Sequence, residues 1–505
     1  MRERAQTIPD VKGVILMLAV LISVQMLVSC DMGLSDEEIT SAVEREVGYD
    51  PVAGPQHVTA TTEDGIVTLR GVTSNLLAKE RAERIAETVR GVRAVVNLVE
   101  VQPPAALPDE RIQQYVQDAF AMSPALRLLD ITTSVEDGTV TLTGTANSRA
   151  AWDLAGTVAK GVRGVREVRN DMDIEWDVTR LDWEIEQEVR ESLRFDVLVD
   201  HGLIDVQVVD GRVILEGVVG SAAERRQARH NAWVAGVNSV DDSDLSVALW
   251  ARDEDLREDR YIDLPDEEIE EALELALLHD PRVLGSNVHA SSDDGVVTLT
   301  GIVMDLRARR AAEETSENTL GVVHVVNQLG VWQETARADS AIIQDLRRAF
   351  DRDPILYEED IAVRISAGIV TLSGSVESSY TRAHAADVAS RVEGVVGVVN
   401  NLMVADDRPL LHDPYLWRFE PGRVVWDRPL RYLPEMPDAS IRQSIERELY
   451  WSPFVDEENV AVTVEDGVAT LTGYVTSPRE REAAARNAYQ GGAVWVENEL
   501  IVLDP

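Results

Sequence analysis

Histidine and cysteine, the side chains that most often hold metals or act as nucleophiles, form no recognisable site in this chain. The 505 residues include one cysteine, Cys30, and eight histidines. No two histidines have the His-x-His or His-x-x-x-His spacing of a zinc site, and no second cysteine could complete one. We interpret the histidines as isolated surface or packing residues and expect neither a metal nor another cofactor. The eight positions are His57, His201, His230, His279, His289, His324, His384 and His412.

The acidic and glycine-containing motifs also have structural interpretations. The runs Asp36-Glu37-Glu38 and Asp266-Glu267-Glu268 are typical of a first helical turn, where carboxylates favour the helix dipole, and no EF-hand loop is present. A recurrent Gly-x-Val-x-Leu-x-Gly segment lacks the Gly-Lys-Ser/Thr of a phosphate-binding loop and the strand-to-helix setting of a nucleotide site. No set of Ser, His and Asp recurs. The sequence therefore predicts a protein that is not an enzyme.

The acidic and glycine-containing motifs belong to a repeat that occurs six times in the chain. Each copy begins with Asp-x-x-Ile, has a glycine 29 residues after the Asp, and has a second glycine six residues later. Because this spacing never varies, each copy is one structural module. The anchors are Asp36/Gly65/Gly71, Asp109/Gly138/Gly144, Asp182/Gly211/Gly217, Asp266/Gly295/Gly301, Asp339/Gly368/Gly374 and Asp438/Gly467/Gly473.

The pattern within one module predicts five elements. The Asp stands where a helix N-cap is expected, and Ile39, Val43 and Val47 follow at helical spacing in the first copy. An Asp-Gly dipeptide in five copies predicts a tight hairpin between two strands, and Ala367-Gly368 replaces it in the fifth. A second helix, residues 75–89 in the first copy, precedes a Gly-Val-x-x-Val-x-Asn strand. The order αββαβ predicts an α+β module, a three-stranded mixed sheet with two helices on one face.

These motifs resemble the BON domain of bacterial envelope proteins. The resemblance rests on the Asp-Gly hairpin, on Gly-x-Val-x-Leu-x-Gly and on Gly-Val-x-x-Val-x-Asn, and it covers about four fifths of the chain. It places modules at 34–102, 107–176, 180–248, 264–332, 338–405 and 437–505. The resemblance implies an exported, non-enzymatic module that associates with phospholipid membranes or other envelope components and helps the envelope to withstand osmotic stress.

The N-terminal 30 residues predict export and a lipid anchor. Basic residues precede an apolar run from Val14 to Val28, which is shorter than a membrane-spanning helix needs. The run ends in Leu-Val-Ser-Cys, which resembles the lipobox of bacterial lipoproteins and implies lipidation of Cys30. An uncleaved anchor helix with an incidental cysteine is the alternative. Either interpretation predicts a tethered protein of the cell envelope and periplasm, at the inner or the outer membrane.

Charge and composition limit the partners. The formal net charge of −42 excludes nucleic acid and opposes attraction to anionic lipid. Two functions remain open, namely association of the modules with phospholipid and a multivalent scaffold that binds envelope proteins.

Two segments separate the modules more widely than elsewhere. Residues 249–263 form a charged linker, and residues 406–436 form a linker rich in aromatic residues and arginine. The second linker either packs against its neighbouring modules or docks onto a partner or lipid interface. Its candidate docking residues are Tyr415, Trp417, Phe419, Trp426, Arg428 and Tyr432.

Overall fold

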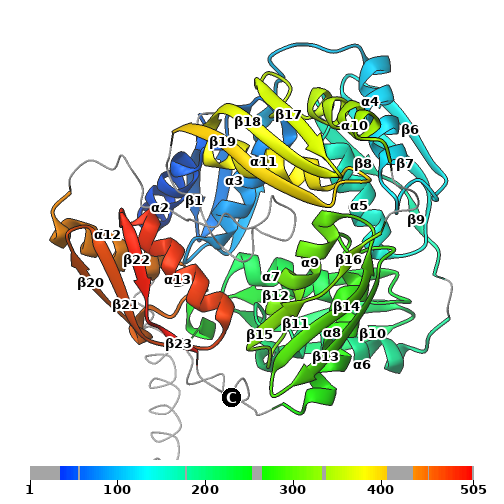
Figure 1. Cartoon of the computed structure of the whole chain (residues 1–505). Coiled ribbons are helices and arrows are strands. Elements are labelled where there is room, and N and C mark those ends of the chain that lie inside the picture. Colours follow the sequence, from blue (N-terminus) through cyan, green and yellow to red (C-terminus); the bar gives the residue numbers. More distant parts are fainter. Residues whose placement is uncertain are drawn as a thin grey trace, which may run out of the picture.

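A computed structural model describes residues 34–54, 57–176, 179–252, 264–332, 337–406, 436–452 and 454–502. Within these ranges the chain forms six modules, each with the element order helix, strand, strand, helix, strand (Figure 1). This is the predicted α+β class. No described helix is long and apolar enough to cross a membrane.

Each module contains two helices, which pack on one face of its sheet. The first helices are α2 (Asp36–Tyr49), α4 (Asp109–Met122), α6 (Asp182–Arg194), α8 (Asp266–His279), α10 (Asp339–Arg352) and α12 (Asp438–Trp451). The second helices are α3 (Leu76–Thr88), α5 (Arg149–Lys160), α7 (Ala222–Asn231), α9 (Leu306–Glu317), α11 (Ser379–Ser390) and α13 (Pro478–Gln490). Short 3-10 helices are η2 (His201–Leu203), η3 (Leu249–Arg252) and η7 (Glu457–Asn459).

The strands form six small mixed sheets, one in each module, and a separate two-stranded parallel pair of β3 and β5 in the first module. The first strands are β1 (Thr59–Glu63), β6 (Ile131–Glu136), β10 (Ile204–Val209), β13 (Asn287–Asp293), β17 (Ile361–Ser366) and β20 (Val460–Glu465). The second strands are β2 (Ile66–Arg70) with β3 (Val72–Thr73), β7 (Thr139–Ala146), β11 (Arg212–Val219), β14 (Val296–Val303), β18 (Ile369–Ser378) and β21 (Val468–Val475). The third strands are β4 (Ala94–Asn97) with β5 (Glu100–Val101), β8 (Glu167–Asn170) with β9 (Asp173–Ile174), β12 (Ser239–Val247), β15 (His324–Asn327) with β16 (Gly330–Val331), β19 (Gly397–Asp406), and β22 (Trp495–Asn498) with β23 (Ile501–Val502).

The second strand is the central strand of every sheet. In the first module it pairs antiparallel with β1 and parallel with β4, and the same topology recurs in the other modules. Its alternating apolar residues are fully buried, as Val67 and Leu69 are in β2. Because these residues pack beneath both helices, each module has a hydrophobic core of its own.

The Asp of Asp-x-x-Ile binds the hairpin and does not occupy the helix N-cap, which corrects the sequence prediction. In the first module Ser35 is the N-cap and Asp36 is the first helical residue. The two carboxylate oxygens of Asp36 accept the backbone N–H groups of Asp64 and Gly65, both at 2.9 Å. Equivalent bonds recur in all six copies, although Asp339 accepts only from Gly368. This clamp explains the fixed spacing of 29 residues.

The anchor glycines occupy backbone conformations that disfavour other residues. At the hairpin, Asp64 and Gly65 have φ of 51° and 73°, as a type I′ turn requires, and Ala367 adopts the same conformation in the fifth module. The second glycine has φ between 118° and 138° in every copy. A Cβ at Gly144 would lie 2.1 Å from the carbonyl oxygen of Asp130. The central strand therefore passes too close to its neighbour for any side chain at this point.

The motif asparagine joins the third strand to the second helix. Asn97 donates from Nδ2 to the carbonyl oxygen of Lys79 at 2.9 Å, and its Oδ1 accepts the N–H of Val99 at 3.2 Å. In the third module Asp242 replaces this asparagine and instead forms ion pairs with Arg225 and Arg229, at 2.9 and 3.0 Å. The substitution retains the link between strand and helix with different chemistry.

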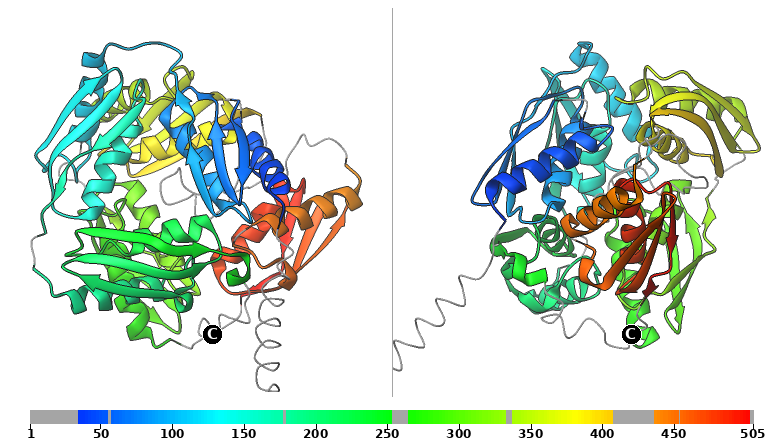
Figure 2. Two further views of the ribbon diagram at one scale, coloured as in Figure 1. Left: turned by 180° about the vertical axis from the view of Figure 1, so that it is seen from behind. Right: turned by 90° about the vertical axis from the view of Figure 1, so that its left-hand side faces the viewer.

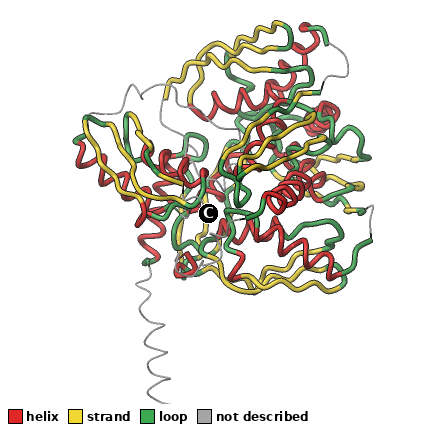
Figure 3. The backbone as a smooth tube through the Cα atoms, turned by 60° about the horizontal axis from the view of Figure 1, so that its bottom comes forward, coloured by secondary structure: helices red, strands yellow, loops and turns green. Residues whose placement is uncertain are grey.

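The six modules form one cluster, with their sheets toward the outside and their second helices toward the middle (Figures 1, 2 and 3). Burial agrees with this arrangement, because ten of the twelve residues of α11 are buried. The modules therefore do not form an extended string, and residues far apart in the sequence meet at their junctions.

Candidate functional site

Three pairs of modules contact one another through equivalent positions. Arg90 donates to the carbonyl oxygen of Tyr450 at 3.0 Å and joins modules one and six. The N–H of Arg163 donates to the carbonyl oxygen of Arg352 at 2.7 Å and joins modules two and five. Modules three and four meet where the N–H of Leu320 donates to the carbonyl oxygen of Phe195 at 2.8 Å.

These contacts use the same two parts of the repeat. Arg90, Arg163 and Leu320 each lie 25 residues after the hairpin glycine of their module. Their acceptors are the last residues of a first helix or the residue directly after it. The pairs one–six, two–five and three–four therefore meet through the same two parts of the repeat, although the donor is a side chain in the first pair and a backbone N–H in the other two.

The pair of modules one and six also buries two carboxyl groups against each other. Glu46 on α2 lies beside Glu448 on α12, and Arg45 contacts Glu46 at 3.1 Å and the ring of Trp451 at 5.8 Å. Burial and the neighbouring Glu448 raise the pKa of Glu46 to about 8. Burial also raises the pKa of Glu448. A proton at this contact is thus favoured in the folded protein at neutral pH.

Cations join the second helices of the first three modules. Lys160 on α5 forms an ion pair with Glu80 on α3 at 2.6 Å, and Arg226 on α7 pairs with Glu87 on α3. Arg149 on α5 lies over the rings of Trp152, at 4.1 Å, and of Trp233, at 4.2 Å. Because each contact crosses or borders a module boundary, the three modules hold one another in place.

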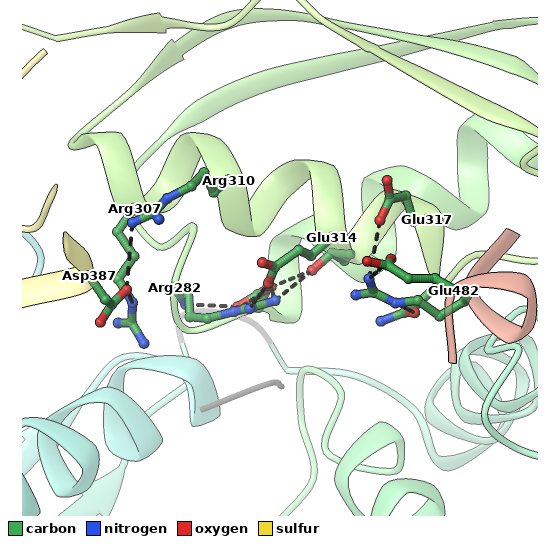
Figure 4. A network of polar contacts seen from close by, with 11 residues as sticks. Arg282, Arg307, Arg310, Glu314, Glu317, Asp387 and Glu482 are labelled. Atoms are coloured by element: carbon green, nitrogen blue, oxygen red, sulfur yellow. Dashed lines mark hydrogen bonds and ion pairs between the residues drawn. The ribbon is translucent and has the colours of Figure 1, made fainter. Parts of the chain in front are cut away.

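A network of arginines and carboxylates connects the fourth module to the fifth and sixth (Figure 4). Asp387 on α11 pairs with three arginines, which are Arg307 at 3.3 Å, Arg310 at 3.7 Å and Arg391. Although burial opposes its ionisation, these arginines hold the pKa of Asp387 well below its usual range. Burial and the nearby Arg391 lower the pKa of Arg307 to about 10. Positive charge is therefore crowded at this junction.

Two further arginines of this junction each pair with two carboxylates. Arg282 pairs with Asp280 at 2.8 Å and with Glu314 at 2.6 Å. Arg479 on α13, 1% exposed, pairs with Glu317 on α9 and Glu482, at 3.3 and 3.4 Å. Among the described residues, no group of three or more His, Cys, Asp or Glu side chains could hold a metal ion.

An open groove lies where the described chain begins. Leu34, the first described residue, lines it together with the hairpin of module one and the end of module three, including Leu249. The groove encloses about 540 Å³. Two large apolar residues directly follow lining residues in the sequence. Ile66 follows Gly65 and is 42% exposed, and Trp250 follows Leu249 and is 48% exposed. Exposed apolar side chains mark a site of contact with a membrane or a partner where they form a contiguous patch.

Six copies of one family model match this sequence. The model is described as "BON domain", and it matches residues 35–103, 108–175, 182–248, 265–331, 338–406 and 437–504. The chain belongs to the BON-domain family. The family resemblance predicted from the motifs is confirmed, and BON domains support an envelope-associated role and are not a catalytic family.

One relative shares a BON-containing region with this chain. Osmotically-inducible protein Y of Escherichia coli (strain K12) is 30% identical over 149 residues, which are 28% of this chain and 72% of that protein. Two solved structures of CdsD, a structural protein of the Type III secretion system of Chlamydia trachomatis, also match, each at 16% identity and a TM-score of 0.12. They cover 43% and 40% of this chain, and 100% and 88% of their own.

The twelve repeat glycines, singled out from the sequence as structural positions, all have positive φ and lie at two places in the BON modules. The hairpin glycines are Gly65, Gly138, Gly211, Gly295, Gly368 and Gly467. The glycines of the central strand, or directly after β2 in the first module, are Gly71, Gly144, Gly217, Gly301, Gly374 and Gly473. Gly65 also lines the groove at Leu34, and the other eleven do not. These glycines therefore shape the backbone, and the structure does not gather them into one site.

The remaining predicted site residues, Cys30 and the docking segment of linker 406–436, lie outside the described residues. The junction arginines were not identified from the sequence. For two of them, Arg307 and Arg479, the sequence holds one signal. They stand six residues after the second glycine of their module, where the first three modules have leucine or alanine.

Proposed function

We propose that this chain is a non-enzymatic, lipid-anchored envelope protein whose six BON modules act as one body on a phospholipid membrane and support envelope integrity under osmotic stress. Family membership supports the envelope location, and the name of the relative, osmotically-inducible protein Y, supports the link to osmotic stress. The Leu-Val-Ser-Cys motif supports lipidation at Cys30.

The position of the groove carries the proposal. Only four peptide units separate Cys30 from Leu34, and they span at most about 14 Å when fully extended. A lipid on Cys30 would therefore hold the groove at the membrane surface, with Ile66 and Trp250 nearby. Tryptophan is favoured at the boundary between lipid head groups and acyl chains.

Electrostatics indicate the kind of contact that the modules make. A chain with a net charge of −42 is repelled by anionic head groups, and salt weakens that repulsion. Contact through exposed apolar side chains does not depend on attraction between charges. Binding should therefore be at least as strong with zwitterionic vesicles as with anionic ones, and salt should not weaken it.

Co-sedimentation of residues 31–505 with zwitterionic and anionic vesicles, at low and high salt, tests the proposal. We expect binding without the lipid anchor, and we expect Trp250→Ala to reduce it several-fold. Trp183→Ala is the matched control, because Trp183 is 65% exposed at the start of α6, at the opposite end of module three from η3. No binding under any condition would contradict membrane contact by the modules and would favour the alternative, a scaffold for envelope proteins.

A further inference from the structure

A cavity of about 130 Å³ lies where four modules meet, and apolar side chains and arginines line its wall. Modules one, two, four and five all contribute to the lining. Among the lining residues, Asp305 and Asp353 are the carboxylates. The cationic lining residues are Arg84, Arg282, Arg307, Arg352 and Arg391. Five arginines and two aspartates line the wall, and the carboxylates that pair with Arg282, Arg307 and Arg391 lie outside the lining.

The two carboxylates of the wall already have partners. Oδ1 of Asp353 accepts the backbone N–H groups of Ile355 and Leu356, at 2.9 and 3.1 Å, and Oδ2 bonds to Nε2 of His384 at 2.7 Å. Asp305 accepts the N–H of Ala308 at 2.8 Å as the N-cap of α9, and burial raises its pKa. Neither carboxylate is paired with Arg352 or Arg391.

Several polar atoms on the wall have no hydrogen-bond partner among the described residues. Arg352 donates from Nη1 to Sδ of Met122 at 3.0 Å and forms no ion pair with any described carboxylate. Nε of Arg391 is buried and donates no hydrogen bond, although Nη2 of the same side chain pairs with Asp387. Nε of Arg307 lies 3.3 Å from Oδ1 of Asp387, in an ion pair without hydrogen-bond geometry. Nδ1 of His384, a residue 4% exposed, is also without a hydrogen bond. Arg307 is itself only 7% exposed.

We propose that this cavity binds a small dianionic oxyanion of the phosphate or sulfate class. Arg352 has no ion pair with a described carboxylate, and Arg307 and Arg391 share the single carboxylate of Asp387. Incompletely neutralised charge in a protein interior is costly, and arginine pairs strongly with tetrahedral oxyanions through its planar set of donors. A volume of about 130 Å³ corresponds to roughly four water molecules and leaves room for one such ion. The ion would supply the charge that Asp387 cannot give to three arginines at once, and it would join modules four and five. None of its proposed ligands lines the groove at Leu34, so this inference is independent of membrane contact.

Calorimetric titration of the full chain with phosphate and with sulfate tests the site, with chloride used to hold ionic strength constant. We expect saturable binding with a dissociation constant near 1 mM or below, and a rise in melting temperature that chloride does not reproduce. Glycerol 3-phosphate serves as a second probe. Its competition with phosphate would identify a phosphate ester as a ligand, and its failure to compete would restrict the site to the free ion.

Substitutions distinguish this site from general effects of anions. Arg352→Gln should weaken phosphate binding at least tenfold, and Arg391→Gln should do the same. Arg352→Gln removes no described ion pair and is therefore the variant to rely on if Arg391→Gln unfolds. Arg169→Gln is the matched control, because Arg169 is 61% exposed on the outer sheet of module two, and it should bind like the parent chain. Unchanged binding by Arg352→Gln, or no binding of either anion to the parent chain below 10 mM, would overturn the proposal.

Discussion

The buried pair of Glu46 and Glu448 makes the contact between modules one and six depend on pH. The charged groups that face Glu46 are Arg45 on its own helix and Glu448 on α12, and Arg447 acts on Glu448. Because the pKa of Glu46 is raised from 4.5 to about 8, the folded state holds a proton that the unfolded state releases. Stability from this contact is complete below pH 4.5 and is lost as the pH rises toward 8.

The size of the effect follows from the shift in pKa. One pKa unit corresponds to about 1.4 kcal/mol, so a shift of this size has an upper bound of about 5 kcal/mol. Glu448 shares the proton, and the side chain of Glu46 keeps 14% exposure to solvent. We therefore expect about half of that bound, roughly 2–3 kcal/mol, across the pH window.

Glu46→Gln removes the titration and keeps a neutral side chain that can donate to Glu448. Thermal and urea unfolding from pH 4 to pH 8.5 should show equal stability of the variant and the parent at pH 4. At pH 8.5 the variant should be more stable by about 2–3 kcal/mol. Glu446→Gln is the matched control, because Glu446 is 50% exposed on the same helix as Glu448, and its stability should follow that of the parent. Parallel pH profiles for the parent and Glu46→Gln would refute the reasoning.

Two further predictions concern the repeat itself. Gly144→Ala should lower the free energy of unfolding by at least about 2 kcal/mol, because its Cβ would meet the carbonyl oxygen of Asp130 and its φ is 125°. Urea titration measures this loss. The control is Gly156→Ala on α5, which should cost little because its Cβ would meet nothing closer than 3.5 Å. Asp109→Ala should lower the free energy of unfolding by about 1–2 kcal/mol more than Glu110→Ala does. Both substitutions remove a charge from the first turn of α4, but only Asp109 binds the hairpin. Equal losses of stability in thermal unfolding would argue against the clamp.

The elements within a module could be predicted from the sequence, because local rules determine them. The Asp-Gly turn, the alternating Val and Leu of the central strand and the closing asparagine each act over short distances. The role of Asp36 was predicted wrongly for the same reason. An Asp before a helix has a familiar local use as an N-cap, and its actual partners, Asp64 and Gly65, lie 28 and 29 residues away.

The arrangement of the modules could not be predicted, because it depends on pairs of residues from different copies. Nothing near Arg81 indicates that it forms a buried ion pair with Asp50 at 2.7 Å, or that it lies 4.9 Å from the ring of Tyr380 in module five. Contacts between modules two and five or one and six join parts of the chain that are far apart in sequence, and no periodicity in the sequence reports them.

The copies differ most informatively at the positions where they meet. The tenth residue after the anchor Asp provides Glu46 and Glu448 in modules one and six, and Ala119 and Ala349 in modules two and five. The two alanines line the cavity between their modules, whereas the two glutamates share a buried contact. If a module with alanine at this position met a module with glutamate, the buried carboxyl group would have no partner. If two glutamates replaced the alanines between modules two and five, they would add negative charge beside Asp353. Each pair thus has its own chemistry at one shared position, which favours the observed partners over the other pairings that identical modules would allow.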